Sequence, residues 1–437
     1  MDTAMETGGD IMSAMRAKVD ELYDFRDHYF ERNSIEKAIQ KTDDVKKELE
    51  TLLKALDEAQ GQIESKSEYL LLRGRALNIL PEFSPEAYDC LSKAVKLDPK
   101  LVEAWNHLGE CYWKKRDIMN AKNCFTGALN YSRNKVSLRN LSMVLRQLGG
   151  TPEERTKFMQ ESLSNIKEAL QLDFNDGTTW FIAGNTYLSL FFASGQSPSI
   201  LKQCLGAYAK AEEDSVAKNN PDLHFNRAAI YRFQEEYQLA LEGYDKARAL
   251  DPLWQEPQDK RKEMINFLWK VTELVRSKGK VKNKKLQQMI SSLKEADLGP
   301  YSGGSYTGAN KETIKLVPCS LANLSVGQNA EKVVVGKVVC SISLEEPIPF
   351  TFAFVDSEGT CYAVNLYNIA QGQGVIIGDS VAIPEPFVQR IDFTIDDKHI
   401  NFSSIRVMSP VFLVVNRRKL GADKQAPATL QVSTMSE

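Results

Sequence analysis

One spaced set of residues recurs through the first half of this chain and limits what the chain can fold into. In "AWNHLGECYWKKRDIMNAKNCFTGAL" (104–129) the set is Trp105, Leu108, Gly109, Tyr112, Ala121, Phe125 and Ala128. Matching positions return later in the chain, at Trp180, Ala183, Gly184 and Tyr187, and at Ala228, Tyr231, Ala240, Tyr244, Ala247 and Pro252. Because several positions match in each copy, the sequence predicts an array of similar helical units.

This frame resembles the tetratricopeptide repeat (TPR), an antiparallel helix pair of about 34 residues. Two further units match it less closely. Their residues are Gly74, Ala87, Leu91, Ala94 and Pro99 in the first, and Leu138, Leu141, Leu145, Ile166 and Ala169 in the second. We therefore expect a TPR array over 1–254, with five units from about 65 to 253 and a divergent one before residue 62.

The residue types at these positions have physical reasons. Glycine at 109 and 184 lets the two helices of a unit approach where a β-carbon would intrude. Small alanines act in the same way from the second helix, and Pro99 and Pro252 mark its end. One unit cannot bury its own apolar face, so the ends of the array need caps. We expect residues 255–290 to form a capping helix with a basic end.

The second half of the chain has a different periodicity. After a predicted linker at 291–314, rich in Gly, Ser and Tyr, β-branched and aromatic runs predict strands between 315 and 412. Five runs, "VVVGKVV", "IPFTFAFVDSEG", "TCYAVNLY", "GDSVAIPEP" and "INFSSIRVMSP", resemble the strand order of an OB-fold, a small Greek-key barrel. Gly336 suits a bend or bulge in the first run. Residues 413–437 are expected to be a disordered tail. The predicted fold is therefore a TPR α-solenoid followed by a small OB-fold β-barrel.

The first helix of each TPR unit lines the concave surface, which gives a set of predicted peptide-binding groove residues. They are Arg75, Asn78, Asn106, Glu110, Trp113, Lys114, Arg139, Met143, Arg146, Phe181, Asn185, Phe225, Asn226 and Arg232. Cations, amides and aromatics together suit an extended or helical peptide. Arg139 and Arg146 lie seven residues apart on one helix face and favour acidic side chains in the ligand. The alternative is that each is only a surface residue.

Some TPR co-chaperones hold a terminal carboxylate with two lysines, two asparagines and one arginine. Asn185 and Asn226 fall at suitable places for such a clamp, but Phe181 occupies an expected lysine position. The chain therefore departs from the pattern of a chaperone-tail clamp.

Positive charge concentrates in "RSKGKVKNKKL". This basic patch holds Arg276, Lys278, Lys280, Lys282, Lys284 and Lys285. It suits RNA contact, a nuclear-localisation signal, or solubilisation of a helix end. The barrel itself is acidic, with five Lys or Arg against ten Asp or Glu from 331 to 408, which disfavours phosphate binding. Single-stranded nucleic-acid or chromatin binding through the barrel and this patch remains the alternative function.

The sequence offers no sign of catalysis, a metal site or a cofactor. None of the four histidines has metal-ligand spacing, and no nucleophile motif or phosphate-binding loop occurs. Seven cysteines without a C-x-x-C pair suit a reducing compartment. The chain shows no secretory signal and no apolar run long enough for a membrane span. We expect a non-enzymatic protein of cytoplasm and nucleus, with no membrane partner.

The combination of about six TPR units, a basic helix end and one OB-fold resembles the family of stress-responsive TPR cofactors of the Strap type. That resemblance implies an adaptor that bridges histone acetyltransferase coactivators and their actin-nucleating cofactor in the DNA-damage and stress response. It also implies a ribosome-associated role, in which the N-terminal peptide of nascent tubulin is recognised and tubulin messenger RNA decays. Neither role follows from composition or spacing. The identity and orientation of the groove peptide and the oligomeric state are not predicted.

Overall fold

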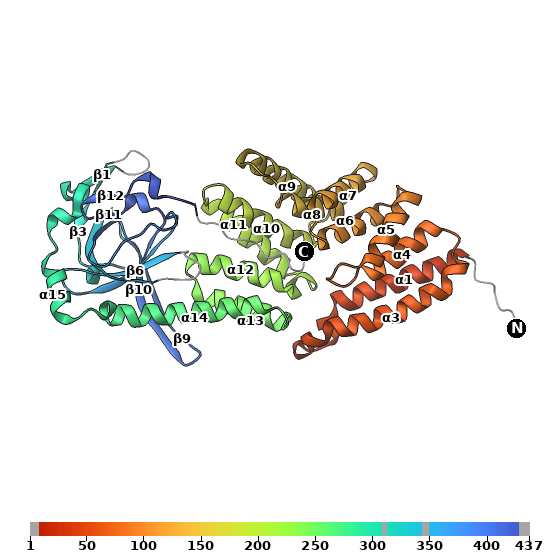
Figure 1. The fold of residues 1–437 in the computed structure, drawn as a ribbon, viewed down its shortest axis with the longest axis horizontal. Coiled ribbons are helices and arrows are strands. Elements are labelled where there is room, and N and C mark those ends of the chain that lie inside the picture. The colour runs from red at the N-terminus through yellow and green to blue at the C-terminus, as the bar shows by residue number, and fades with distance from the viewer. Residues whose placement is uncertain (1–7, 308–312, 343–348, 428–437) are drawn as a thin grey trace. The chain divides into compact units, whose positions relative to one another are not determined.

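Helix pairs account for most of the first 250 residues (Figure 1). The computed structural model describes residues 8–307, 313–342 and 349–427. The pairs are α4 (Lys66–Leu77) with α5 (Pro85–Leu97), α6 (Val102–Lys114) with α7 (Ile118–Tyr131), α8 (Lys135–Leu145) with α9 (Pro152–Leu172), α10 (Gly177–Ala193) with α11 (Pro198–Glu212), and α12 (Pro221–Gln234) with α13 (Tyr237–Leu250). These helix pairs lie in the stretch where five TPR units are expected, and the two helices of each pair are in contact.

The divergent unit precedes them. It consists of α1 (Gly8–Asp27), the short helix α2 (Tyr29–Arg32), the 3-10 helix η1 (Ile35–Gln40) and α3 (Lys41–Ala59). The structure divides into two units, one up to Asp259 and the other from Lys260 to Thr429. We call them the helical unit and the barrel unit. The boundary falls inside α14 (Gln255–Arg276).

Close approach within each pair explains the glycines of the repeat. A β-carbon on Gly109 would lie 2.5 Å from the ring of Phe125, and one on Gly184 would lie 2.5 Å from the ring of Tyr208. Phe125 and Tyr208 are fully buried, so neither ring has free space to move into. The expected role of these two glycines is confirmed.

The turn between units also repeats. The second helices α5, α9 and α13 each end at an aspartate, Asp98, Asp173 and Asp251, whose carboxylate accepts a hydrogen bond from the backbone N–H two residues later. The Trp105 indole then donates to the carbonyl of Pro99 at 2.9 Å, and Trp180 donates to Phe174 at 2.7 Å. The repeated tryptophan therefore fixes the turn that precedes its own helix.

The barrel unit contains six main strands. They are β5 (Lys332–Ile342), β6 (Phe350–Val355), β7 (Cys361–Leu366), β8 (Ser380–Pro384), β9 (Phe387–Ile395) and β10 (Lys398–Val407). Neighbouring strands follow the order β8-β5-β6-β7-β10-β9, and β7 and β10 run parallel while the other pairs are antiparallel.

Strands β8 and β9 close the barrel. Only Glu385 and Pro386 separate them, so they act as one bent strand that begins beside β5 and ends beside β10. This arrangement confirms the expected OB-fold. The predicted irregularity in the first long strand is present, but the register shift lies between Val338 and Cys340 instead of at Gly336.

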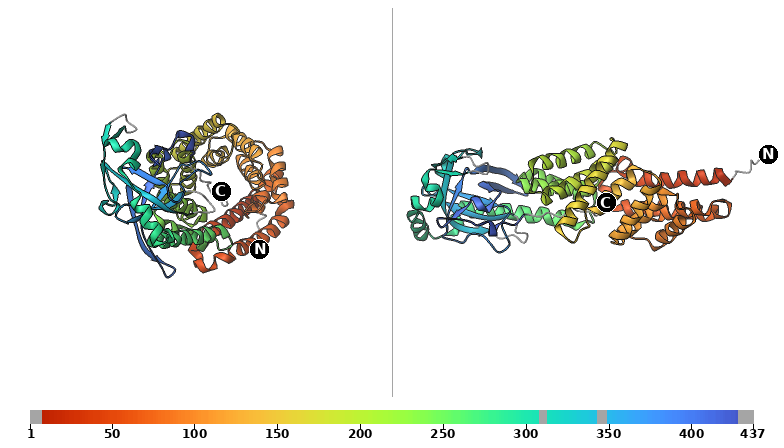
Figure 2. Two further views of the ribbon diagram at one scale, coloured as in Figure 1. Left: turned by 60° about the vertical axis from the view of Figure 1, so that its left-hand side comes forward. Right: turned by 90° about the horizontal axis from the view of Figure 1, so that it is seen from above.

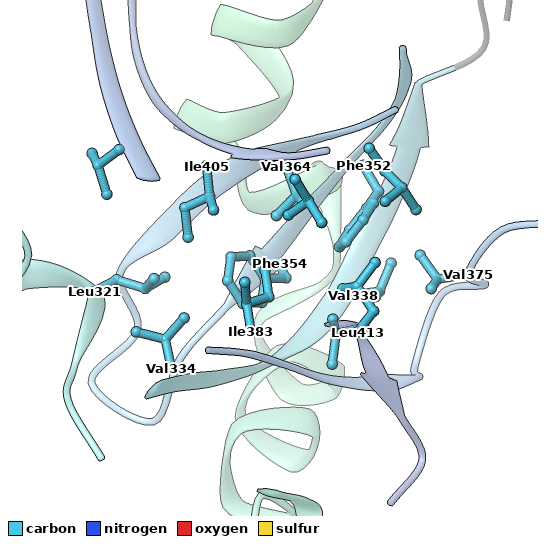
Figure 3. Close-up of a cluster of buried hydrophobic side chains, with 14 residues drawn as sticks. Leu321, Val334, Val338, Phe352, Phe354, Val364, Val375, Ile383, Ile405 and Leu413 are labelled. Carbon is cyan, nitrogen blue, oxygen red and sulfur yellow. The ribbon is translucent and has the colours of Figure 1, made fainter. Parts of the chain in front are cut away.

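Alternate residues of β6 and β7 fill the barrel core (Figure 3). Phe352, Phe354 and Val364 point inward and are completely buried. They meet Val334 and Val338 of β5. The strand aromatics are therefore core residues, as alternation along a strand predicts.

The expected linker and tail are partly folded. Within 291–314, η5 (Glu295–Gly303) buries Leu298 and Tyr301, and β1 (Ser305–Thr307) pairs with β2 (Thr313–Lys315). Within 413–437, β11 (Val414–Val415) pairs with β8 and β12 (Arg418–Lys419). Tyr301 donates to the carbonyl of Phe412 at 2.7 Å, and Arg417 bonds Asp297 at 3.0 Å. The expected linker and the expected tail hold each other in place through contacts of few residues. Because most residues of both segments have loop-like composition, composition alone predicted loops.

The smaller elements complete the chain. They are η2 (Gln60–Gln62), η3 (Ala217–Asn219), η4 (Lys278–Lys280), α15 (Asn283–Ser291), β3 (Val317–Pro318), η6 (Leu321–Asn323), β4 (Gly327–Gln328), η7 (Pro410–Phe412) and η8 (Ala422–Lys424). The expected capping helix over 255–290 is thus broken between α14 and α15. Gly279, with a φ of 68°, permits the break.

Two glycine substitutions test the packing argument. Alanine is favoured over glycine inside a helix by about 0.8–1.0 kcal/mol. At Gly109 that gain is offset by overpacking against Phe125, which costs about 1–3 kcal/mol. Gly206 of α11 has no atom within 4 Å of its β-carbon position. We expect Gly109→Ala to lower the melting temperature and Gly206→Ala to raise it, by far-ultraviolet circular dichroism. Stabilisation by both would contradict the close-approach argument.

Candidate functional site

A carboxylate on α6 is the centre of a polar cluster between α4 and α6. Glu110 accepts a hydrogen bond from the amide nitrogen of Asn78 at 2.9 Å, and its carboxylate lies 2.9 Å from Nδ1 of His107. Burial alone would raise the pKa of Glu110. The charges of His107, Lys114 and Arg139 and the hydrogen bond from His107 outweigh it and lower the pKa to about 2. Glu110 is therefore ionised at neutral pH.

Lys114 is held by the carbonyls at the end of α4. Its ammonium donates to the carbonyls of Asn78 and Leu80, both at 2.6 Å, and to Oδ1 of Asn78 at 2.8 Å. Burial lowers its pKa, and the charge of Glu110 acts in the opposite direction. All three donors of the ammonium have protein acceptors. Lys114 therefore links the TPR unit of α6 to that of α4 and is not a freely exposed cation.

Arg75 of α4 is paired in the same way. It forms ion pairs with Asp20 at 2.7 Å and with Glu103 at 2.9 Å, and its guanidinium lies 4.8 Å from the ring centre of Tyr23. The Tyr23 hydroxyl donates to the carbonyl of Arg75 at 2.9 Å. The N-terminal helix α1 thus covers this predicted groove position.

The predicted groove amides connect successive first helices. Ser137 donates to Asn106 at 2.7 Å. Asn185 accepts from the hydroxyl of Tyr208 at 2.5 Å and from Asn226 at 3.1 Å. Asn106, Asn185 and Asn226 are buried, and the latter two have no exposed surface. Hydrogen bonds among these amides and to neighbouring hydroxyls offset the free-energy cost of removing the amides from water.

Four apolar groove predictions lie in the core. Trp113, Met143, Phe181 and Phe225 are all buried. Phe225, for example, packs against Trp254 with ring centres 4.7 Å apart. In this structure their side chains offer a ligand almost no surface.

Three arginines on first helices keep part of their side chains at the surface. Arg139, Arg146 and Arg232 are half-buried and come from α8, the cap of α8 and the last turn of α12. Arg139 also forms an ion pair with Asp176 at 2.9 Å. Together with Arg75 and Lys114, these three are the cationic side chains among the predicted groove residues, and each of the five keeps part of its surface exposed.

The sequence frame missed three contributors to the polar cluster and one buried acid. Tyr23 and Arg26 come from α1, which lies outside the matched TPR units, and His107 lies beside a framework position. Arg26 lies 4.6 Å from the Tyr23 ring centre, and the rings of Tyr23 and His107 are 6.0 Å apart. Asp222 of α12 is fully buried. No repeat signal marks α1, so its place beside α4 and α6 was not predictable from spacing.

The basic patch is fixed on the barrel. Lys278 and Lys280 belong to η4, and η4 lies against β5 and β6. A β-carbon on Gly279 would lie 2.5 Å from the carbonyl of Val339. Lys280, Lys282, Lys284, Lys285 and Arg276 are exposed, while Lys278 is half-buried. The lysines are thus presented from a turn and a short helix on the barrel surface.

The outward face of β6 and β7 is covered. Thr351, Ala353, Ala363 and Asn365 alternate with the core residues, yet each is at most 1% exposed. Thr351 donates to Asn365 at 2.8 Å. The close packing of Gly279 on Val339 occurs on the adjoining strand β5. OB-folds that bind single strands do so with aromatics and cations on an open face, which is not present on these two strands.

The stretch 104–129 contains a cysteine, Cys111, whose environment argues against a role as a nucleophile. Cys111 is completely buried, and burial raises the pKa of its thiol to about 12. The thiol donates a weak hydrogen bond to Asn78 at 3.5 Å. A protonated, buried thiol is unsuited to attack a substrate.

Over residues 8–307, 313–342 and 349–427, no three His, Cys, Asp or Glu side chains gather as a metal site would require. In the same part of the chain, no helix has the length and apolar character that a membrane span needs.

Known proteins resemble this chain both over the barrel region and over almost its whole length. The family model described as the tetratricopeptide repeat protein 5 OB fold domain matches residues 315–429. Human tetratricopeptide repeat protein 5 is 50% identical over 422 residues, and the alignment covers 96% of each chain. The mouse protein of that name is 49% identical over 424 residues, again covering 96% of each. A solved structure titled YrrB, a TPR protein with an unusual peptide-binding site, has a TM-score of 0.31 at 22% identity and covers 48% of this chain and 98% of its own. That TM-score is too low to support an argument.

The pKa of Glu110 generates a pH prediction. Its ordinary value is 4.5 and its folded value about 2, so the carboxylate stabilises the fold above pH 4.5. That contribution is lost as the pH falls from 4.5 towards 2. We expect the stability difference between the unaltered chain and Glu110→Gln to shrink over this range, measured by urea unfolding at several pH values. Glu64→Gln, at an exposed position, is the control. A constant difference for Glu110→Gln would contradict the prediction.

Proposed function

The chain belongs to the tetratricopeptide repeat protein 5 family, and from this premise we propose that it is a non-enzymatic adaptor that binds a short peptide on the concave side of its TPR array. The observation that carries the proposal is the set of half-buried arginines, Arg139, Arg146 and Arg232, on first helices. Guanidinium groups bind carboxylates through two parallel hydrogen bonds. An acidic side chain or a terminal carboxylate is the ligand group that fits them.

The surroundings of these arginines support selective binding. Buried amides and the ionised Glu110 fix the first helices against one another, so the arginines extend from a rigid surface. A rigid surface reduces the entropy lost when a flexible peptide binds. The ionised Glu110 adds negative charge to the same set of first helices, which favours a peptide that carries both signs of charge over a purely acidic one.

The finer role that we propose follows the family resemblance. In the cytoplasm, the ligand is the N-terminal peptide of nascent tubulin at the ribosome, and its recognition leads to decay of tubulin messenger RNA. The exposed lysines of the basic patch suit the phosphates of ribosomal RNA in that setting. In the nucleus, the same array acts as a stress-responsive cofactor that bridges acetyltransferase coactivators and their actin-nucleating cofactor.

The alternative, single-stranded nucleic-acid or chromatin binding through the barrel, is less well supported. Thr351, Ala353, Ala363 and Asn365 on β6 and β7 are buried, and the barrel is acidic from 331 to 408. Any nucleic-acid contact is assigned to the basic patch alone.

Arginine substitutions test the groove. We expect Arg139→Ala and Arg146→Ala each to weaken binding of a tubulin N-terminal peptide, because a charge-assisted hydrogen bond is worth about 1.5–3 kcal/mol. That corresponds to roughly a 10- to 150-fold higher Kd, measured by fluorescence anisotropy. Arg133→Ala is the matched control, since Arg133 is exposed and pairs with Glu168. Full affinity in both groove variants would refute the assignment.

Charge reversal tests the basic patch. We expect the combined change of Lys282, Lys284 and Lys285 to Glu to abolish co-sedimentation with ribosomes and to leave peptide affinity unchanged. Ribosome binding by the unaltered chain should fall steeply as salt rises, because phosphate contacts release counterions. Salt-insensitive binding would show that the patch does not contact RNA.

A further inference from the structure

The helical unit closes on itself. Its helices follow a ring-like course, and the 3-10 helix η1 of the divergent unit lies against α13 of the last TPR unit (Figure 2). A TPR array is otherwise an open superhelix in which each unit touches its neighbours. Residues 28–41, which we call the strap, run from the end of α1 through η1 to the first residue of α3. They join the two ends of the array.

One end of the strap is firmly anchored. It follows directly on Tyr23 and Arg26, which pack against α4 and α6. The guanidinium of Arg26 reaches the carbonyl of Ile79 at 3.4 Å. Inside the strap, Tyr29 is completely buried and donates to Asp44 of α3 at 2.8 Å. These contacts fix the strap to the N-terminal part of the array.

The middle of the strap, η1, makes only a weak contact with α13. Ala38 is the one buried residue of η1, while Ile35 and Ile39 are 43% and 53% exposed. Lys41 lies 5.1 Å from the ring centre of Phe30 and within electrostatic reach of Asp251, at the end of α13. Because η1 buries one small side chain and no described ion pair joins it to α13, its contact with α13 adds little stability to the closed ring.

We propose that the strap is a clasp, in which η1 detaches from α13 to let a peptide reach the concave surface and then closes behind it. The inference rests on the proposed function and concerns the regulation of that same site. The anchored end limits the motion to a hinge near residues 33–34, between α2 and η1. Asn33 caps α2 by donating its backbone N–H to the carbonyl of Tyr29, and the extended backbone of Asn33 and Ser34 separates α2 from η1.

A clasp of this kind has a kinetic signature. Because η1 contributes no groove residue, opening changes the rates of entry and exit by the same factor and leaves the Kd unchanged. Minor open states are typically populated at about 0.1–10%. Making the open state dominant therefore raises both rate constants about tenfold or more.

Three variants separate the clasp from the groove. Ala38→Arg places a long charged side chain at the one buried position of η1 and should open the clasp. Ile39→Ala, at the exposed neighbouring position, is the matched control. Lys41→Glu places a negative charge near Asp251 and opens the clasp by repulsion, without inserting bulk in η1. Circular dichroism verifies that each variant is folded, and Lys41→Glu carries the test should Ala38→Arg fail to fold.

The measurement is stopped-flow binding of a labelled tubulin N-terminal peptide to the full chain. The expected result is a rise of about tenfold or more in both association and dissociation rate constants for the opening variants, an unchanged Kd, and unchanged rates for Ile39→Ala. Unchanged rates in Ala38→Arg and Lys41→Glu, with normal peptide binding, would overturn the clasp and leave the proposed function intact. Absence of peptide binding by the unaltered chain would overturn the proposed function, and the clasp with it.

Discussion

The close approach of the two helices within each TPR unit is the constraint on which the rest of the helical structure depends. Gly109 and Gly184 remove a β-carbon where an aromatic ring of the second helix must pass. This contact sets the spacing of each pair, and the spacing in turn sets which residues of the first helices meet across units. The polar contacts between units, such as Asn78 with Glu110 and Asn185 with Asn226, are possible only at that spacing.

The sequence predicted the architecture well because packing at the framework positions allows few residue types. Gly109, Phe125 and Trp105 are examples, and the alternating Phe352 and Phe354 did the same for the barrel. The groove was harder to predict. Helical spacing places Phe181 and Asn226 on a first helix, but burial depends on how tightly successive units curve, which is a tertiary property. The fold of the expected linker around Tyr301 has a similar cause, since long-range hydrogen bonds such as that from Tyr301 to the carbonyl of Phe412 hold it.

The polar residues on the first helices are of types that serve either ligand binding or contacts between helices, and spacing alone cannot separate these two roles. Lys114 and Arg75 have the side chains of ligand-binding residues, yet their donors are taken by carbonyls and carboxylates of neighbouring helices. Such contacts rigidify the array, because a charged group that is desolvated without a partner is costly. In the proposed function, ligand contact falls to Arg139, Arg146 and Arg232. On that proposal, stability and binding are divided among residues of the same chemical type.

The barrel unit likewise separates buried structural residues from exposed charged residues. An OB-fold is commonly associated with nucleic acid, but here small and neutral residues, Ala353, Ala363 and Thr351, form a buried outward face instead of an open one with aromatics and cations. Gly279 packs on the adjoining strand so closely that no side chain fits. The barrel therefore serves as a support that holds the basic turn and α15 in a fixed position. The segment that the barrel supports supplies the positive charge that the acidic barrel lacks, so the proposed phosphate contact falls on the basic patch instead of on β6 and β7.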